Sequence, residues 1–248
     1  MSPGGNQPKV QFGQQAYDEI NSLISQGHFS KIFILVDSNT HEACLPHFLP
    51  KLQTTLGIEI IEMEQGEEMK NLDTCASIWK VLSELDADRK SLLINLGGGV
   101  VTDLGGFIAA TFKRGIAFVN VPTTLLSMVD AAVGGKTGIN LDSLKNQIGV
   151  IRPAELVLID SKFLQTLPAN EMRSGLAEML KHGLIKSETV WKRLLRLEAM
   201  NSEDLDGLIQ ESIAIKEEIV AQDPTEKNIR KSLNYGHTLG HAIESYFL

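Results

Sequence analysis

The stretch NLGGGVVTDLGGF, residues 95–107, decides the fold because it joins a strand pattern to a helix pattern through consecutive glycines. The preceding run SLLINLG (91–97) is short, apolar and typical of a buried parallel strand. The following run VVTDLGGFIAATFKRG (100–115) has the pattern of a helix that ends at Gly115. Backbone amides at the start of such a helix can bind a pyrophosphate, and glycine allows it to come close. The stretch therefore predicts a strand, a phosphate-binding turn and a helix.

The glycine turn fits the dinucleotide fingerprint G-x-G-x-x-G only in part. Gly97 and Gly99 stand at the first two glycine positions, whereas Thr102 stands at the third. A tight turn that serves only the packing of the strand against the helix is therefore a second interpretation of the same residues.

Four further apolar runs extend the strand pattern on both sides of this turn. Each is short and rich in β-branched residues, as buried parallel strands are: KIFILVD (31–37), IEIIEM (58–63), AFVNVP (117–122) and LVLID (156–160). Helical patterns such as NLDTCASIWKVLSELD (71–86) separate several of them. This alternation predicts an α/β domain with a mainly parallel sheet and with ligands at the carboxyl ends of its strands.

Three polar segments would meet at that edge of the sheet. Asp37 ends the run 31–37, GEEMK (66–70) follows the run 58–63, and PTT (122–124) closes the run 117–122. A carboxylate at a strand end can accept hydrogen bonds from a ribose. Each segment alone would be an ordinary loop. Their common position at the strand ends favours a bound nucleotide.

The chain changes character near residue 165, where strand patterns give way to almost continuous helical patterns. We therefore expect an α/β domain over residues 1–165 and an all-α domain over residues 166–248. A length of 248 residues and a hydrophobic content of 43% are sufficient for a substantial core. Cys44 and Cys75 show no metal-ligand spacing and are expected to be packed thiols.

Composition also limits the location and the partners. No apolar run reaches the roughly 20 residues of a membrane span, and the first residues lack the apolar core of a secretion signal. We therefore expect a cytoplasmic protein that binds no membrane. The net charge of −8 disfavours nucleic acid as a partner, because binding to nucleic acid needs a basic surface.

The segment DAAVGGKTG (130–138) looks like a nucleotide-phosphate loop, but Asp130 stands where that loop has its leading glycine. A carboxylate there would repel a phosphate, and the preceding residues have a helical rather than a strand pattern. We therefore interpret the segment as binding neither ATP nor GTP. Lys136 must have another partner.

The helical part contains the metal candidates. His237 and His241 are four residues apart, so on a helix they share a face and could both reach one site. Glu178 and Lys181 lie one turn apart, with His182 beside them. A solvated ion pair and a packed or surface histidine are the simplest interpretation of these three. Glu178, a histidine and one more ligand would instead form a zinc site open to substrate.

Five motifs, in order and at matching separations, resemble the 3-dehydroquinate synthases: GGGVVTDLGGF, VPTTLLSMVDAAVGGKTGIN, KNQIG, GLAEMLKHGLI and LNYGHTLGHAIE. The resemblance spans the chain from about residue 30 to Leu248. It implies an N-terminal NAD-binding α/β domain, a helical C-terminal domain and a cytoplasmic homodimer.

The resemblance also implies an activity, that of a phosphate-eliminating carbon–oxygen lyase of the shikimate pathway. The expected substrate is 3-deoxy-D-arabino-heptulosonate 7-phosphate and the expected products are 3-dehydroquinate and phosphate. The expected cofactors are NAD and zinc or cobalt. NAD⁺ would take a hydride from C5 and later return it, with phosphate elimination between these steps and ring opening and aldol closure after them.

Carried over position by position, the resemblance assigns NAD contacts to Asp37, Glu67, Lys70, Gly98, Gly99, Asp103, Thr123, Thr124, Lys145 and Thr166. It assigns the metal to Glu178 and His237, so only one histidine of the shared face would bind it. It assigns the sugar-phosphate substrate to Asp130, Lys136, Lys145, Asn146, Lys181, Lys216, Arg230, Asn234 and His241. Arg114 would reach the site of the neighbouring subunit. Lys136 then binds a sugar phosphate rather than a nucleotide.

The same resemblance places a third zinc ligand, a histidine, and a further substrate-binding lysine beyond the position of Leu248. We therefore expect a C-terminally truncated chain. Other sugar-phosphate cyclases share this scaffold, and polyol and iron-dependent alcohol dehydrogenases share it more distantly. A noncatalytic NAD-binding or dimerisation module is the alternative from outside the enzymes.

Overall fold

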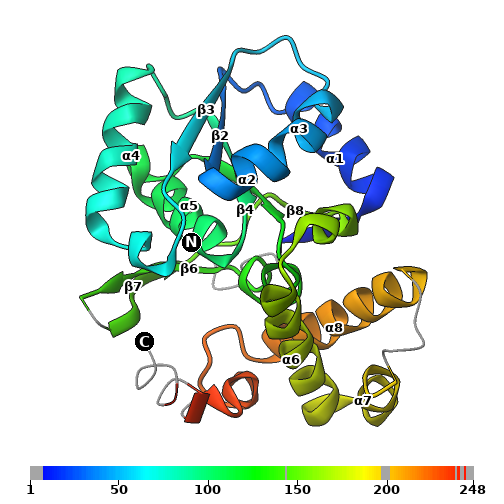
Figure 1. The fold of residues 1–248 in the computed structure, drawn as a ribbon. Helices are drawn as coiled ribbons and strands as arrows, with labels where there is room; N and C mark the ends of the chain where they lie inside the picture. Colours follow the sequence, from blue (N-terminus) through cyan, green and yellow to red (C-terminus); the bar gives the residue numbers. More distant parts are fainter. Residues whose placement is uncertain (1–7, 143, 197–201, 238, 241–242, 244–248) are drawn as a thin grey trace.

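We describe a computed structural model that covers residues 8–142, 144–196, 202–237, 239, 240 and 243. A sheet with helices packed on it forms one part, and a group of helices from the second half of the chain lies below it (Figure 1). Within these ranges, none of the helices combines the length and the apolar character that crossing a membrane requires.

The sheet contains six parallel strands in the order β1-β8-β5-β4-β2-β3. In chain order their bounds are β1 Lys9–Phe12, β2 Ile32–Asp37, β3 Ile58–Met63, β4 Leu92–Gly97, β5 Ala117–Pro122 and β8 Leu156–Ile159. Leu92 of β4 pairs with Ile32 of β2 on one side and Ala117 of β5 on the other. All five predicted strands and the parallel sheet are confirmed. β1 was not predicted.

Helices fill the connections between the strands, as a parallel sheet requires. They are α1 Gly13–Gln26, α2 Ser38–Ala43, α3 Leu45–Phe48, α4 Leu72–Glu84 and α5 Gly99–Thr111, with 3₁₀ turns at Leu49–Lys51, Glu67–Met69, Phe112–Arg114 and Ser161–Thr166. Asn71 caps α4 by accepting from the Thr74 amide at 2.9 Å. α5 lies against β2, β4 and β5. Gly105 allows this approach, because a Cβ there would lie 2.0 Å from Asn95 Oδ1.

A two-stranded antiparallel hairpin leaves the main sheet after β5. It consists of β6 Lys136–Leu141 and β7 Leu144–Ile151, and a short π-helix at Ser127–Ala131 precedes it. The hairpin lies between the sheet and the helices of the second half (Figure 1). β6 packs on α5, whereas β7 is exposed along nearly its whole length.

The second half of the chain is helical, as predicted. It contains α6 Ala169–Lys186, α7 Glu188–Leu194, α8 Ser202–Gln222 and a 3₁₀ turn at Ile229–Asn234. α6 packs on α7, on α8 and on the π-helix before the hairpin. The domain boundary near residue 165 stays a prediction.

Both cysteines are buried and free. Burial raises the pKa of the Cys75 thiol to about 12. It also raises the pKa of Cys44 to about 11, against the opposing effect of hydrogen bonds with Thr123 and Thr166. The prediction of packed thiols is confirmed by the burial of both side chains.

Asp160, directly after β8, joins three helical segments to the sheet. Its carboxylate accepts from Tyr17 at 2.8 Å, His47 at 3.0 Å and Lys51 at 3.2 Å. Burial alone would raise the pKa of Asp160, but these bonds and one from the Lys162 amide outweigh it and lower the pKa to about 2.

We expect Asp160→Asn to lower the free energy of unfolding by about 2 kcal/mol at neutral pH. The stabilisation belongs to the ionised carboxylate, so it is complete above the unfolded-state pKa of about 3.9 and is lost as the pH falls toward 2. Urea unfolding of both proteins at several pH values measures this difference. The exposed Asp18→Asn serves as the control, and a difference that stays constant down to pH 2 would contradict the account.

Candidate active site

The predicted nucleotide-binding residues lie at the carboxyl edge of the sheet. Gly98 is the N-cap of α5 and directly follows β4, and no side chain caps this helix. Thr124 stands beside it, since a Cβ on Gly98 would lie 3.1 Å from the Thr124 methyl group. Thr123 directly follows β5 and is buried. The first amides of α5 and the Thr124 side chain thus lie next to each other, an arrangement suited to a pyrophosphate.

Asp37 ends β2 at the same edge but has a local partner as well. Its Oδ1 accepts from the Thr40 amide at 2.8 Å, and the Thr40 hydroxyl in turn accepts from the Asp37 amide. This reciprocal pair is a capping box at the start of α2. The cap fixes the direction of the carboxylate, and Oδ2 takes no part in it.

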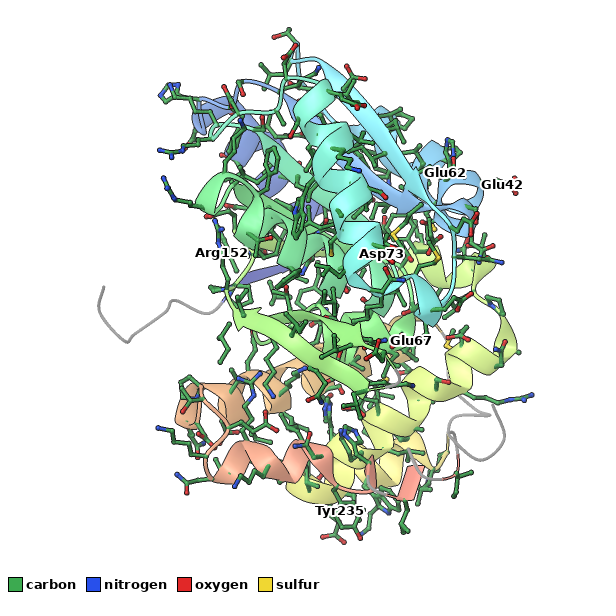
Figure 2. All side chains as sticks on the ribbon, turned by 90° about the vertical axis from the view of Figure 1, so that its left-hand side faces the viewer. Glu42, Glu62, Glu67, Asp73, Arg152 and Tyr235 are labelled. Atoms are coloured by element: carbon green, nitrogen blue, oxygen red, sulfur yellow. The ribbon has the colours of Figure 1, made fainter. Side chains whose placement is uncertain are left out.

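Lys70 connects the segment after β3 to α5 and to the hairpin. Its Nζ lies 2.5 Å from Asp103 Oδ2 and 2.6 Å from Asn146 Oδ1, and the residue is only 4% exposed. Burial raises the pKa of Asp103, while the charge of Lys70 opposes this rise. Glu67 lies beside the hairpin (Figure 2), where it accepts from Asn140 Nδ2 at 3.0 Å. The structure therefore brings Glu67, Lys70, Asp103 and Asn146 together at one end of α5.

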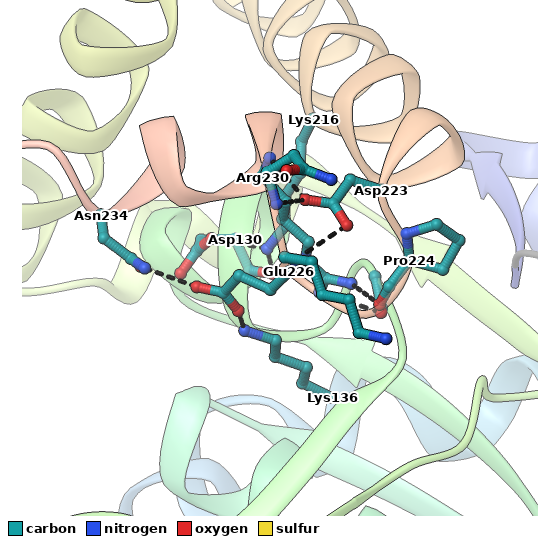
Figure 3. A network of polar contacts seen from close by, with 11 residues as sticks. Asp130, Lys136, Lys216, Asp223, Pro224, Glu226, Arg230 and Asn234 are labelled. Atoms are coloured by element: carbon teal, nitrogen blue, oxygen red, sulfur yellow. Dashed lines mark hydrogen bonds and ion pairs between the residues drawn. The ribbon is translucent and has the colours of Figure 1, made fainter.

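Three of the predicted substrate-binding cations, Lys136, Lys216 and Arg230, lie close together, and each has an acceptor from the protein (Figure 3). Lys145, in contrast, is exposed on β7. Lys216 Nζ lies 2.5 Å from Asp130 Oδ1, and its side chain is 7% exposed. Burial alone would raise the pKa of Asp130, but Lys216, Lys181 and His182 outweigh it and hold the pKa well below its usual range. Arg230 donates to the backbone oxygens of Pro224 at 2.8 Å and of Gly134 at 3.2 Å.

Glu178 lies in the buried face of α6, one turn from two basic residues. Its Oε1 is 2.6 Å from Lys181 Nζ and 3.2 Å from His182 Nε2. The side chains of Glu178 and Lys181 are each 9% exposed, so the interpretation as a solvated ion pair is wrong. α6 is covered here by α8 and by the 3₁₀ turn at Ile229–Asn234, whose Leu233 carbonyl accepts from Lys181.

His182 is fully buried, so it is a packed histidine rather than a surface histidine. Its Nδ1 lies 2.7 Å from Ser212 Oγ of α8, and this contact holds the ring with Nε2 toward Glu178. Within the described ranges, neither Glu178 Oε1 nor His182 Nε2 has a hydrogen bond of acceptable direction. Buried polar atoms without such bonds occur where water or an ion binds, although the Lys181 ammonium group already neutralises Oε1.

The ligand atoms of Asp130, Glu178 and His182 lie within 4.8 Å of one another. Carboxylate oxygen and imidazole nitrogen are the donors that zinc and cobalt accept, so the residues present fit such a metal. His237, the second predicted ligand, is half-buried and is not a member of this group. His241 lies outside the described residues. The assignment of the metal to Glu178 and His237 stays a prediction.

Arg114 lies apart from the predicted residues at the carboxyl ends of the strands. It is exposed, has a φ of 70°, and belongs to the tight turn that leads into β5. Arg114 precedes the amino end of β5, whereas Thr123 follows its carboxyl end. Arg114 therefore lies at the opposite end of the sheet from Thr123. Within one chain, it therefore does not join the residues that follow the carboxyl ends of the strands.

Sequence reasoning missed two residues that complete the cluster. Glu226 pairs with Lys136 and accepts from Asn234, and Ser212 holds His182. The segment QDPTEKNIR (222–230) could have indicated Glu226, because it places two acidic residues between the predicted cations Lys216 and Arg230. No sequence pattern indicated Ser212.

Comparisons with known proteins show which family the chain belongs to. The family model described as 3-dehydroquinate synthase N-terminal matches residues 60–174, and the one described as 3-dehydroquinate synthase C-terminal matches residues 175–248. The 3-dehydroquinate synthase of Parabacteroides distasonis is 47% identical over 244 residues, which cover 97% of this chain and 68% of that protein. The chain belongs to the 3-dehydroquinate synthase family. A member from Listeria monocytogenes is 44% identical over 90% of this chain and 62% of its own length.

Two solved structures of other cyclases share the fold of this chain. A 2-deoxy-scyllo-inosose synthase complexed with carbaglucose-6-phosphate, NAD⁺ and Co²⁺ is 27% identical, with a TM-score of 0.85 over 97% of this chain and 70% of that one. The 2-epi-5-epi-valiolone synthase of Streptomyces hygroscopicus, with NAD⁺ and Zn²⁺ bound, shares the fold at 24% identity and a TM-score of 0.82, over 96% of this chain and 68% of that one. The chain thus spans about two thirds of the length of the proteins it matches.

Proposed function

We propose that this chain carries out the 3-dehydroquinate synthase reaction, the conversion of 3-deoxy-D-arabino-heptulosonate 7-phosphate to 3-dehydroquinate and phosphate. The observation that carries the proposal is the buried cluster around Glu178, in which carboxylates and cations alternate next to a glycine turn suited to NAD. Membership of the family supports the same assignment.

NAD and a divalent metal complete this site in the proposal. The glycine turn at Gly98, with Thr123 and Thr124, would hold the pyrophosphate, and Asp37 would accept from a ribose. Glu178 would hold zinc or cobalt, with His237 as the predicted second ligand. When bound, NAD⁺ supplies the acceptor for a hydride from C5, and the metal supplies a Lewis acid at the C5 oxygen.

The cations of the cluster bind and orient the anionic substrate. Lys136 is the most accessible of the four basic groups described at the centre, with 49% of its side chain exposed. Burial lowers the pKa of Lys136, and the charges of Arg230 and Lys216 lower it further. A substrate phosphate or carboxylate beside Lys136 would therefore relieve repulsion among like charges. Holding a single conformer in this way is the main contribution of these residues.

The products formed from three substrates test this assignment against the related cyclases. With NAD⁺ and zinc or cobalt present, the chain should convert 3-deoxy-D-arabino-heptulosonate 7-phosphate to 3-dehydroquinate. It should leave sedoheptulose 7-phosphate and glucose 6-phosphate unchanged, since neither carries a carboxylate for the basic cluster. Cyclisation of either of these would favour another sugar-phosphate cyclase.

We further propose a cytoplasmic homodimer in which Arg114 serves the partner's site. The exposed hairpin supports this arrangement, because four large apolar residues are accessible on it: Leu141, Leu144, Val150 and Ile151. An accessible strand with apolar side chains is a typical surface for pairing between chains. Arg152, labelled at the end of the hairpin in Figure 2, donates to the Ile116 oxygen at 2.9 Å. The turn that carries Arg114 therefore adjoins this surface.

The substitution Ile151→Glu is expected to convert the dimer to a monomer, because a charge at a dry interface without a partner is strongly unfavourable. Ile151 is 57% exposed within one chain. Leu195→Glu is the matched control, since Leu195 is 62% exposed on the helical part. Sedimentation velocity measures the mass of each variant. A dimer that persists in Ile151→Glu, or a monomeric wild-type chain, would remove the hairpin from the interface.

A further inference from the structure

Glu226 lies at the centre of the polar network drawn in Figure 3. It belongs to the loop between α8 and the 3₁₀ turn at Ile229–Asn234. One carboxylate oxygen pairs with Lys136 Nζ, and the other accepts from Asn234 Nδ2. The Glu226 side chain is 19% exposed. A protein carboxylate thus occupies two groups that the proposed function assigns to an anionic substrate.

Lys136 differs from the neighbouring cations in the origin of its counter-ion. The side chain of Lys216 is 7% exposed and is held by both the carboxylate and the backbone oxygen of Asp130. Arg230 is 3% exposed and donates to two backbone oxygens. The side chain of Lys136, in contrast, is 49% exposed, and its partner Glu226 extends from a loop. The Lys136–Glu226 contact is therefore the one that a ligand can displace at the lowest cost.

The base of the loop is fixed independently of Glu226. Asp223 accepts from the amides of Lys227 at 2.9 Å, Asn228 at 2.6 Å and Arg230 at 3.2 Å. Glu226 itself has a φ of 57°, in the left-handed region that is unfavourable for residues other than glycine. The side-chain contacts of Glu226 offset this backbone cost. Loss of these contacts would therefore free the tip of the loop and leave its base in place.

We propose that Glu226 is an internal counter-ion, which occupies Lys136 and Asn234 in the ligand-free chain and is displaced when an anionic group of the substrate binds. The substrate class in this inference rests on the proposed function. Because the carboxylate competes with the ligand, the apparent affinity for an anion equals the intrinsic affinity multiplied by the fraction of chains in which Glu226 is displaced. Glu226 thereby compensates the charge of Lys136 and excludes weakly binding anions.

Binding of inorganic phosphate to the chain without NAD or metal tests the proposal by isothermal calorimetry. We expect Glu226→Gln to bind phosphate about fivefold more tightly than the wild-type chain, as removal of a partly exposed competing ion pair predicts. Glu226→Asp, with a shorter reach, should show a smaller gain. Glu218→Gln removes another carboxylate, which pairs with Lys186 on the surface, and should change nothing.

A second substitution tests whether the gain in phosphate affinity arises at Lys136. Adding Lys136→Met to Glu226→Gln should abolish the gain in phosphate affinity, because Lys136 is the group that Glu226 releases. Three results would overturn the proposal. They are equal or weaker phosphate binding by both Glu226 variants, a gain in affinity that survives Lys136→Met, and no phosphate binding by any of these proteins. Absence of 3-dehydroquinate formation with an intact gain in phosphate affinity would refute the proposed function alone.

Discussion

Asp130→Ala is expected to lower the free energy of unfolding by about 3 kcal/mol. Lys216 is only 5% exposed and would lose its carboxylate partner, which leaves a buried ammonium group with one backbone acceptor. Breaking a buried ion pair from one side costs more than the pair contributes, because the remaining charge stays desolvated. The loss lies at the lower end of the usual range, since the Asp130 side chain is 34% exposed. Urea unfolding at neutral pH measures it.

The matched control removes both charges. Asp130→Ala combined with Lys216→Met should be more stable than Asp130→Ala alone, because no unpaired charge remains. Additive losses in the double variant would show that the two side chains do not interact. A loss below about 1 kcal/mol in Asp130→Ala would show that water already reaches Lys216.

Glu178→Gln is expected to reduce turnover at least about 100-fold, the size of effect seen when one preorganised electrostatic group is removed from an active site. Glutamine keeps the shape of the side chain but is a poor metal ligand, and it leaves the buried Lys181 without its nearby carboxylate. The affinity for zinc should fall as well. Phosphate release measures the first effect, and competition with a zinc-binding dye measures the second.

Glu188→Gln is the control for this substitution, because Glu188 pairs with Lys192 at the surface, and its side chain is 77% exposed. It should retain both turnover and zinc affinity. Unchanged zinc affinity in Glu178→Gln would remove Glu178 from the metal site. Unchanged turnover would place the chemistry elsewhere.

The parallel sheet could be predicted because its central strands are buried on both faces and contain nearly continuous apolar runs. β2 and β4 are examples, with fully buried side chains at almost every position. β1 was missed because it is a four-residue edge strand without a fully buried side chain. The hairpin was missed for a related reason, since exposure along β7 removes the alternation by which strands are recognised.

The sequence could predict which residues are candidates for the site, but it could not predict which of them pair with one another. Lys216 and Asp130 are 86 residues apart in the chain, and Lys70 and Asn146 are 76 apart. Such contacts depend on the packing of α8 and the hairpin, which local patterns do not determine. The burial of Glu178 with His182 depends in the same way on Ser212 of α8. Local spacing alone therefore suggested a solvated ion pair.

The central claim is that the site eliminates phosphate through a transient oxidation rather than carrying out a net oxidation. The most direct measurement mixes the purified chain with NAD⁺, zinc or cobalt and 3-deoxy-D-arabino-heptulosonate 7-phosphate, and records phosphate release and NADH absorbance together. The account predicts one phosphate per substrate consumed and no lasting NADH. Lasting NADH in proportion to the substrate consumed, without phosphate release, would contradict it and would indicate a dehydrogenase.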